Sequence, residues 1–133
     1  MTRYSFANLD AWARKVQKRT DAIVKTSAQE VVSIAQTPRA KGGRMPVDTG
    51  FLRNSLQSSL QGSTGLTGPD SYVMIAASME AGSRARFGWT AEYAAAVNNG
   101  ARGRAGAHFV EGAADQWPQI VAKAVARAKA LNP

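Results

Sequence analysis

The sequence contains no cysteine and only one histidine, His108, among its 133 residues. Without cysteine the chain cannot form a disulfide, a thiolate metal site or a cysteine nucleophile. A metal site built from several histidines is excluded in the same way, and any Ser-His-Asp arrangement would have to use His108. Because His108 stands directly before Phe109 at a predicted helix start, we expect its role to be structural.

The sequence also lacks a long apolar segment and an N-terminal signal pattern. A membrane-spanning helix needs about 20 consecutive apolar residues, and no such run is present. We therefore expect a soluble protein that is not exported and does not associate with a membrane. A length of 133 residues suits one domain with a modest core, so we expect residues 1–133 to form a single domain.

Acidic residues are few, and no two of them have the spacing of a known carboxylate dyad or metal motif. The nine acids are Asp10, Asp21, Glu30, Asp48, Asp70, Glu80, Glu92, Glu111 and Asp115. Carboxylates that are distant in sequence can converge in a fold, so catalysis is disfavoured rather than excluded. The glycine-rich stretch at residues 62–70 lacks the Gly-Lys-Ser/Thr ending of a phosphate-binding loop. We expect no enzyme activity, no cofactor and no metal.

What the chain has in excess is positive charge, with 17 lysines and arginines, a net charge of +8 and a pI near 10.5. Such a balance favours a polyanionic neighbour such as nucleic acid, without naming one. The cations that we predict to contact a partner lie in three glycine-containing loops: Arg39, Lys41 and Arg44; Arg84 and Arg86; Arg102 and Arg104. They could bind phosphates, bind an acidic protein surface, or simply face solvent.

Apolar spacing predicts a long helix over residues 9–36. The residues that share one helical face are Leu9, Trp12, Val16, Ile23, Ser27, Val31 and Ile34. Asn8 is expected to cap the start, and Pro38 to end the helix by keeping Thr37 out of the helical region. The helix would be roughly 40 Å long, which is more than the domain's own core needs. We therefore expect the end that carries Trp12 either to pack on the domain or to lie in a subunit interface.

Two strands are predicted in the middle of the chain, at residues 55–61 and 71–78. The second contains Tyr72-Val73-Met74-Ile75, which are mostly β-formers, and the two strands would pair as an antiparallel hairpin. In the segment that follows, Phe87 and Trp89 stand beside arginines and could stack on bases or pack as a satellite core. Loops that we expect to be mobile lie near residues 37–46, 61–71 and 82–90.

Two further helices are predicted in the last third of the chain. Thr90 would cap a short helix over residues 91–98, which Asn99-Gly100 would end. A final helix spans residues 109–131, and Pro118 either kinks it or restarts it. Together these elements predict an α+β fold with a long N-terminal helix, a small antiparallel β-sheet, a short helix, and a C-terminal helix packed on the sheet.

The least generic stretch is a corner at residues 46–56. Its structural residues are Pro46, Asp48, Thr49, Gly50, Leu52 and Arg53. The proline fixes its own backbone angle, the aspartate or threonine side chain can accept bonds from N–H groups downstream, and the glycine tolerates strained dihedrals. We expect a turn that starts one turn of helix, with the leucine pointing inward and the arginine outward.

This corner is also the first of three motifs that resemble one protein family. The run Pro-Val-Asp-Thr-Gly-x-Leu-Arg-x-Ser at residues 46–55 resembles the signature of bacteriophage tail-completion proteins, the neck or head-tail joining proteins of long-tailed phages. The family's second motif is similar to residues 93–100, from Tyr93 to Gly100, although Asn98 replaces its usual acid. The third, a basic residue, Pro and Phe before the last helix, is similar to Ala107-His108-Phe109 without the Pro.

The resemblance implies a structural virion protein without enzyme activity. Its expected partners are further copies of itself in a ring, a head connector or adaptor protein, and the tail terminator or tail tube protein. The ring would be a hexamer in the virion, formed from a protein that is a monomer when isolated, and packaged DNA would occupy its channel. The protein would assemble in the host cytoplasm and remain at the neck of the virion.

The alternative, which rests on charge alone, is a free nucleic-acid-binding protein. It predicts binding to DNA that falls steeply with salt. The sequence contains no helix-turn-helix signature, no zinc ligands and no RNP-like aromatic pair, so no known DNA-reading motif supports this alternative. A nuclease or lysin has the least support, because the acids and the single histidine form no catalytic pattern.

Overall fold

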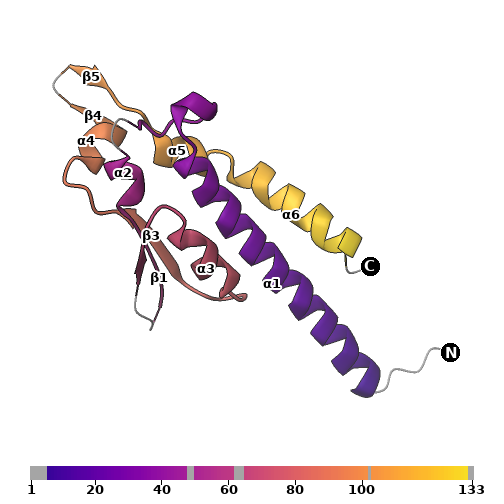
Figure 1. The fold of residues 1–133 in the computed structure, drawn as a ribbon. Helices are drawn as coiled ribbons and strands as arrows, with labels where there is room; N and C mark the ends of the chain where they lie inside the picture. The colour runs from indigo at the N-terminus through magenta and orange to yellow at the C-terminus, as the bar shows by residue number, and fades with distance from the viewer. Residues whose placement is uncertain (1–5, 48–49, 62–64, 102, 132–133) are drawn as a thin grey trace.

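The structure, a computed structural model, describes residues 6–47, 50–61, 65–101 and 103–131. Its elements are arranged along a 31-residue helix, α1 (Phe6–Gln36) (Figure 1). The N-terminal part of α1 extends beyond the other elements, whereas its C-terminal half is flanked on both sides by further helices. The predicted long helix is confirmed, but it begins before Asn8, so Asn8 lies inside the helix and does not cap it.

The buried face of α1 is turned away from the predicted apolar stripe, because Ser27 is the one residue of that stripe that is buried. Its buried residues are Ser27, Ala28, Val32, Ala35 and Gln36. The predicted face residues Ile23, Val31 and Ile34 are only half-buried. The helices that cover α1 from two sides bury other positions on it. At the other end Trp12 is 66% exposed. The helix ends at Gln36, two residues before Pro38, as predicted.

A three-stranded antiparallel sheet stands beside α1, with the strand order β2-β1-β3. Its central strand is β1 (Leu56–Leu60), which confirms the strand predicted at residues 55–61. The neighbours are β2 (Leu66–Thr67) and β3 (Ala85–Trp89). In the register, Leu56 is opposite Trp89 and Ser58 is opposite Phe87.

The strand predicted at residues 71–78 is wrong, because this segment forms helix α3 (Ser71–Ala77). Ser71, Ile75 and Met79 are buried at a spacing of four, which is the spacing of a helix and not of a strand. Burial of this face against α1 and β1 therefore overrides the β-propensity of Tyr72 and Val73. The Ser71 hydroxyl lies 2.9 Å from that of Ser58 and joins α3 to the sheet.

The actual partner of β1 lies in a segment that the sequence predicted to be a loop. Strand β3 occupies most of residues 82–90, and β1 pairs with it across five residue pairs. The glycines at 82 and 88 suggested a loop, but Gly88 is accommodated within the strand opposite Gln57. The loop assignment at residues 82–90 is therefore wrong for its second half.

The corner contains the predicted single turn of helix, α2 (Phe51–Asn54). Gly50 precedes it in the left-handed conformation with φ of 81°, which a glycine adopts without strain. Leu52 is buried, as predicted. Arg53 is half-buried and does not point outward, because its Nε donates to the Gln36 carbonyl at 3.0 Å. Asp48 and Thr49 lie outside the described residues.

The predicted short helix begins later than expected, as α4 (Ala94–Asn99). Tyr93 precedes it, and Thr90 does not cap it, because the Thr90 hydroxyl donates to the Ser55 carbonyl at 3.1 Å instead. Gly100 ends the helix as predicted, with φ of 91°. Beyond it, β4 (Gly100–Ala101) and β5 (Arg104–Ala105) form a separate two-stranded hairpin.

The last predicted helix is interrupted and forms α5 (Phe109–Ala114) and α6 (Trp117–Leu131). Pro118 is the second residue of α6, so of the two alternatives the restart is correct. The α+β class is confirmed, with one correction to the packing. Helix α6 lies along α1, and it is α3 that contacts the sheet (Figure 1).

The core consists of two clusters of buried side chains. The first contains Met45, Leu52, Ala91, Ala107 and Phe109, with Trp89, Ala94 and Val97 packed against it. The second contains Ala28, Ala76 and Met79, with Val24, Leu60 and Ala85 packed against it. We call the first the corner cluster. No helix in the described ranges is both long and apolar enough to cross a membrane.

Candidate partner-binding surface

The three motifs of the sequence meet in the corner cluster. Leu52 from the first motif and Phe109 from the third belong to this cluster, and Val97 from the second packs against it. The Phe109 ring also contacts the Trp89 ring edge-on, with 4.9 Å between centroids and 81° between planes. Residues as far apart in the sequence as Leu52 and Phe109 therefore build one structural unit.

Gln36 ties this unit to the end of α1. Its side-chain amide is buried and donates to the carbonyls of Arg53 and Pro69, each at 3.0 Å. Its Oε1 accepts a bond from Trp89 Nε1 at 2.8 Å. Both amide hydrogens and the carbonyl are thus used, which removes the penalty of burying a polar group. Sequence reasoning missed Gln36, since nothing in the pattern distinguishes it from an exposed helix-end glutamine.

The segment that connects α1 to the corner packs against the domain. Met45 is wholly buried, although it lies in the segment near residues 37–46 that the sequence predicts to be a loop. The Arg39 N–H donates to the Met45 carbonyl at 3.1 Å, and the Met45 N–H donates to the Thr37 carbonyl at 3.2 Å. Gly43 passes so close to the Thr37 backbone that a Cβ would collide with it. These contacts hold the backbone of Arg39, in the short 3-10 turn Arg39–Lys41, beside the corner.

An open hollow of about 800 Å³ lies next to the corner cluster, and we call it the corner hollow. Two of the predicted contact residues, Arg39 and Arg104, line it from different segments of the chain. The other lining residues are Pro46, Tyr93, Ala96, Val97, Ala101, Ala105 and Ala107. Two cations over an apolar lining, with no acid among the lining residues, suit a partner side chain or segment that carries a carboxylate.

An exposed aromatic pair stands beside the corner hollow. The rings of Phe51 and Tyr93 have their centroids 6.1 Å apart and are tilted by 38°. Both side chains are largely exposed, as is Val47. Exposed aromatics that gather next to a pocket are typical of protein–protein interfaces. Sequence reasoning assigned Tyr93 a structural role and did not single out Phe51.

The remaining predicted cations do not join the corner hollow. Arg44 lies against Gly112 within α5 and lines a separate hollow with it. Arg84 and Arg86 accompany β3 at the end of the sheet that packs on the second cluster. Lys41 is exposed and does not line the hollow. Arg102 lies outside the described residues.

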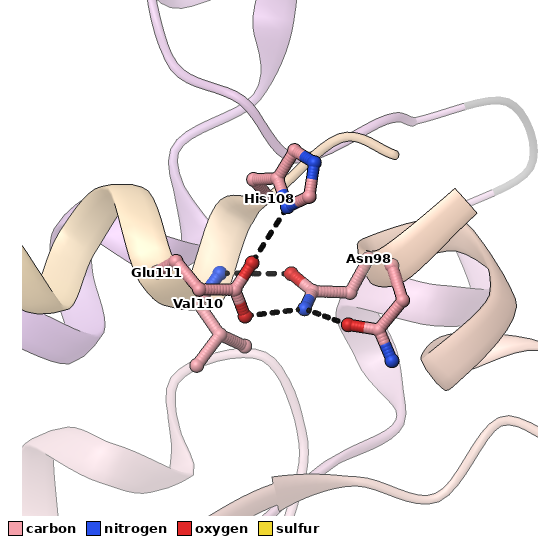
Figure 2. Close-up of polar contacts among 5 residues, drawn as sticks. Asn98, His108, Val110 and Glu111 are labelled. Atoms are coloured by element: carbon pink, nitrogen blue, oxygen red, sulfur yellow. Dashed lines mark hydrogen bonds and ion pairs between the residues drawn. The ribbon is translucent and has the colours of Figure 1, made fainter. Parts of the chain in front are cut away.

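Asn98, from the second of the three motifs, is the centre of a polar network at the start of α5 (Figure 2). Its Oδ1 accepts the Val110 N–H at 3.1 Å, and its Nδ2 donates to Glu111 Oε1 at 2.6 Å and to Asn99 Oδ1 at 3.0 Å. The other oxygen of Glu111 lies 2.7 Å from His108 Nδ1. The asparagine thus supplies an acceptor and a donor at once, which an aspartate cannot do.

The network lowers the pKa of the Glu111 carboxyl. The hydrogen bond from Asn98 is the largest cause and the bond from His108 the next, since both favour the charged form. His108 itself occupies the position before α5 with φ of 50°, in the left-handed region. Its contacts therefore join the α4 end to the α5 start. Within the described ranges, no group of three acids or histidines is placed to hold a metal ion.

Comparisons with protein-family models, with curated proteins and with solved structures find no match for this chain.

Proposed function

We propose that this chain is a structural protein of the bacteriophage neck, where copies of it form a ring that joins the DNA-filled head to the tail. The observation that carries the proposal is the convergence of the three motifs in the corner cluster. Packing of the three motifs against one another is what we expect of motifs that belong to one structural unit. The ring would continue the DNA channel between the head connector and the tail.

The corner hollow is the surface that would meet a neighbouring ring. Arg39 and Arg104 supply positive charge at its wall, and the pair Phe51 and Tyr93 supplies exposed aromatic area beside it. A connector or tail protein that offers a carboxylate next to an apolar side chain would complement both features. Packaged DNA is the other polyanion that these arginines could approach within the channel.

The extended end of α1 would supply contacts between subunits. Leu9, Trp12 and Val16 are exposed on a part of the helix that reaches beyond the other elements (Figure 1). A ring would bury such a face between neighbouring copies, and if the ring formed only on the head or tail, the free protein would be a monomer.

A free nucleic-acid-binding protein remains the rival, and the distribution of charge does not favour it. The predicted contact cations of the described residues are divided between the corner hollow, the Arg44 side of the connecting segment and the far end of the sheet, and other cations lie on α1 and α6. A protein that tracks a nucleic-acid backbone usually concentrates them along one face or groove.

The proposal is tested by joining heads to tails with purified protein. Heads and tails from a lysate in which the gene is inactivated are mixed with wild-type protein or with the double variant Arg39→Gln, Arg104→Gln, and joined particles are counted by electron microscopy. We expect wild-type protein to join them and the double variant to fail. The double variant should unfold at the wild-type temperature, because both arginines are exposed.

The matched control neutralises two exposed cations of α6, Lys123→Gln and Lys129→Gln, and removes the same net charge. It should join heads to tails as the wild type does. If the control fails equally, or if the corner variant succeeds, the hollow is not the contact surface. If the protein joins nothing but binds DNA with a steep salt dependence, the rival function is correct.

A further inference from the structure

The outer edge of β3 carries backbone groups that the sheet does not use. β3 is an edge strand, since the order of the sheet is β2-β1-β3. The Gln61 N–H donates to the Arg84 carbonyl at 2.9 Å and the Thr90 N–H to the Ser55 carbonyl at 3.1 Å, which fixes the alternation of the ladder. Every second residue from Arg84 to Thr90 therefore bonds to β1, and the residues between them direct their N–H and C=O groups away from it.

The outward groups belong to Ala85, Phe87 and Trp89. In the part of the chain that the structure describes, these backbone groups have no hydrogen-bond partner. Natural proteins usually protect such an edge with a proline, charged side chains, a bulge or a covering segment. β3 contains no proline, pairs with β1 without a break in register and carries one charged side chain, Arg86. The edge is therefore open to a further strand.

The charge beside this edge indicates which strand would fit. Ala85 and Trp89 pack on the two core clusters, so the alternate side chains of Arg84 and Arg86 lie on the opposite, solvent face of the sheet. Both arginines are exposed, and within the described ranges neither forms an ion pair. A strand added beside β3 would place every second side chain next to these arginines.

We propose that the β3 edge binds an extended segment of a partner protein in which acidic residues alternate with apolar ones. The partner's backbone completes the ladder at Ala85, Phe87 and Trp89, and its acids face Arg84 and Arg86. A second copy of β3 is disfavoured as the occupant, because it would bring two more arginines to the same face. This surface is distinct from the corner hollow, and the inference does not depend on the protein's being a neck protein.

The test is a titration of ¹⁵N-labelled full-length protein with a capped peptide of sequence Glu-Val-Glu-Val-Glu-Val, with Lys-Val-Lys-Val-Lys-Val as the charge control. We expect the acidic peptide to shift the amide signals of Ala85, Phe87 and Trp89 and to slow their hydrogen exchange by about tenfold. The amides of Arg86 and Gly88 already bond to β1 and should keep their exchange rates. The lysine peptide should produce neither effect.

Two variants separate strand addition from simple charge attraction. Phe87→Pro removes an outward N–H without breaking a bond to β1 and should abolish binding, whereas Phe87→Ala removes the ring and keeps the N–H, so it should still bind. If Phe87→Pro does not fold, Ala85→Pro, which removes another outward N–H, is used in its place. The double variant Arg84→Glu, Arg86→Glu should reverse the preference, from the acidic to the lysine peptide.

Three results would overturn the proposal. The first is an absence of protection at the three outward amides at about 1 mM acidic peptide. The second is equal binding by the proline and alanine variants, which would mean attraction without strand pairing. The third is protection that rises with protein concentration alone, together with a doubled mass, which would make a second copy the occupant. None of these results bears on head-tail joining, so the two proposals fail independently.

Discussion

At the scale of single residues, Gln36 makes the clearest case for a structural side chain. We expect Gln36→Leu to lower the free energy of unfolding by about 3 kcal/mol, because the change leaves the Arg53 and Pro69 carbonyls and the Trp89 indole N–H without their partner. In a thermal melt this corresponds to a midpoint roughly 10 °C lower.

The matched control for this prediction is Gln29→Leu, on the exposed face of the same helix. It should change the free energy of unfolding by less than about 0.5 kcal/mol. A Gln36→Leu protein as stable as this control would show that the three hydrogen bonds contribute nothing net.

We expect the contribution of Asn98 to stability to depend on Glu111. Asn98→Asp replaces a donor with a carboxylate 2.6 Å from Glu111 Oε1, and we expect it to cost about 2 kcal/mol of stability. The double variant Asn98→Asp, Glu111→Gln restores a donor and an acceptor to this contact. It should recover most of the loss in urea unfolding, and an additive double variant would contradict the account.

The lowered pKa of Glu111 predicts a dependence of stability on pH. The pKa of Glu111 in the folded state lies below the ordinary value of a glutamate. The charged carboxylate therefore stabilises the fold at a pH above the ordinary pKa, and this stabilisation is lost as the pH falls through the folded-state pKa. Between about pH 5 and pH 2 the melting temperature of the wild type should fall more than that of Glu111→Gln. Parallel curves for the two proteins would be evidence against the network.

At the scale of elements, we expect α6 to be a separate helix that starts at Trp117, and not the continuation of α5 after a kink. Pro118 is the second residue of α6, where the missing N–H is not needed, so Pro118→Ala should change stability by less than about 0.5 kcal/mol. Ala122→Pro lies inside the same helix and should cost about 3 kcal/mol or more. If Pro118→Ala stabilises the protein strongly, as the relief of a kink would, a continuous helix from 109 to 131 is the better description.

The elements that were predicted correctly are those defined by local signals. Pro38 ends α1, Gly50 precedes α2 and Gly100 ends α4, because proline and glycine act on the backbone where they stand. The errors concern pairing and burial. Tyr72 and Val73 favour a strand, yet their segment is helical, since one face of it is buried between α1 and β1.

The candidate site was predictable only in part, because tertiary packing, and not a local signal, decides which residues meet there. Arg39 and Arg104 could be selected as exposed cations, but nothing local indicates that they line one hollow while Arg84 and Arg86 lie elsewhere. Their grouping depends on how α4 and the connecting segment pack on the corner cluster. Gln36 is a further example, since its partners are 17, 33 and 53 residues away.

At the scale of the whole molecule, the exposed end of α1 should matter for assembly and not for folding. Trp12 is 66% exposed, so Trp12→Gln should change stability by less than about 0.5 kcal/mol. We expect the same variant to lose the ability to join heads to tails, because the ring could no longer bury this face. Trp117→Gln, at another exposed tryptophan, is the control and should join them normally. A fully active Trp12→Gln protein would remove α1 from the subunit interface.

The most direct test of the neck proposal is to inactivate the gene in the genome that carries it and to image the lysate by electron microscopy. The proposal predicts that DNA-filled heads and complete tails accumulate without being joined, and that a plasmid-borne copy of the wild-type gene restores whole particles. Whole infectious particles in the absence of the protein would contradict it.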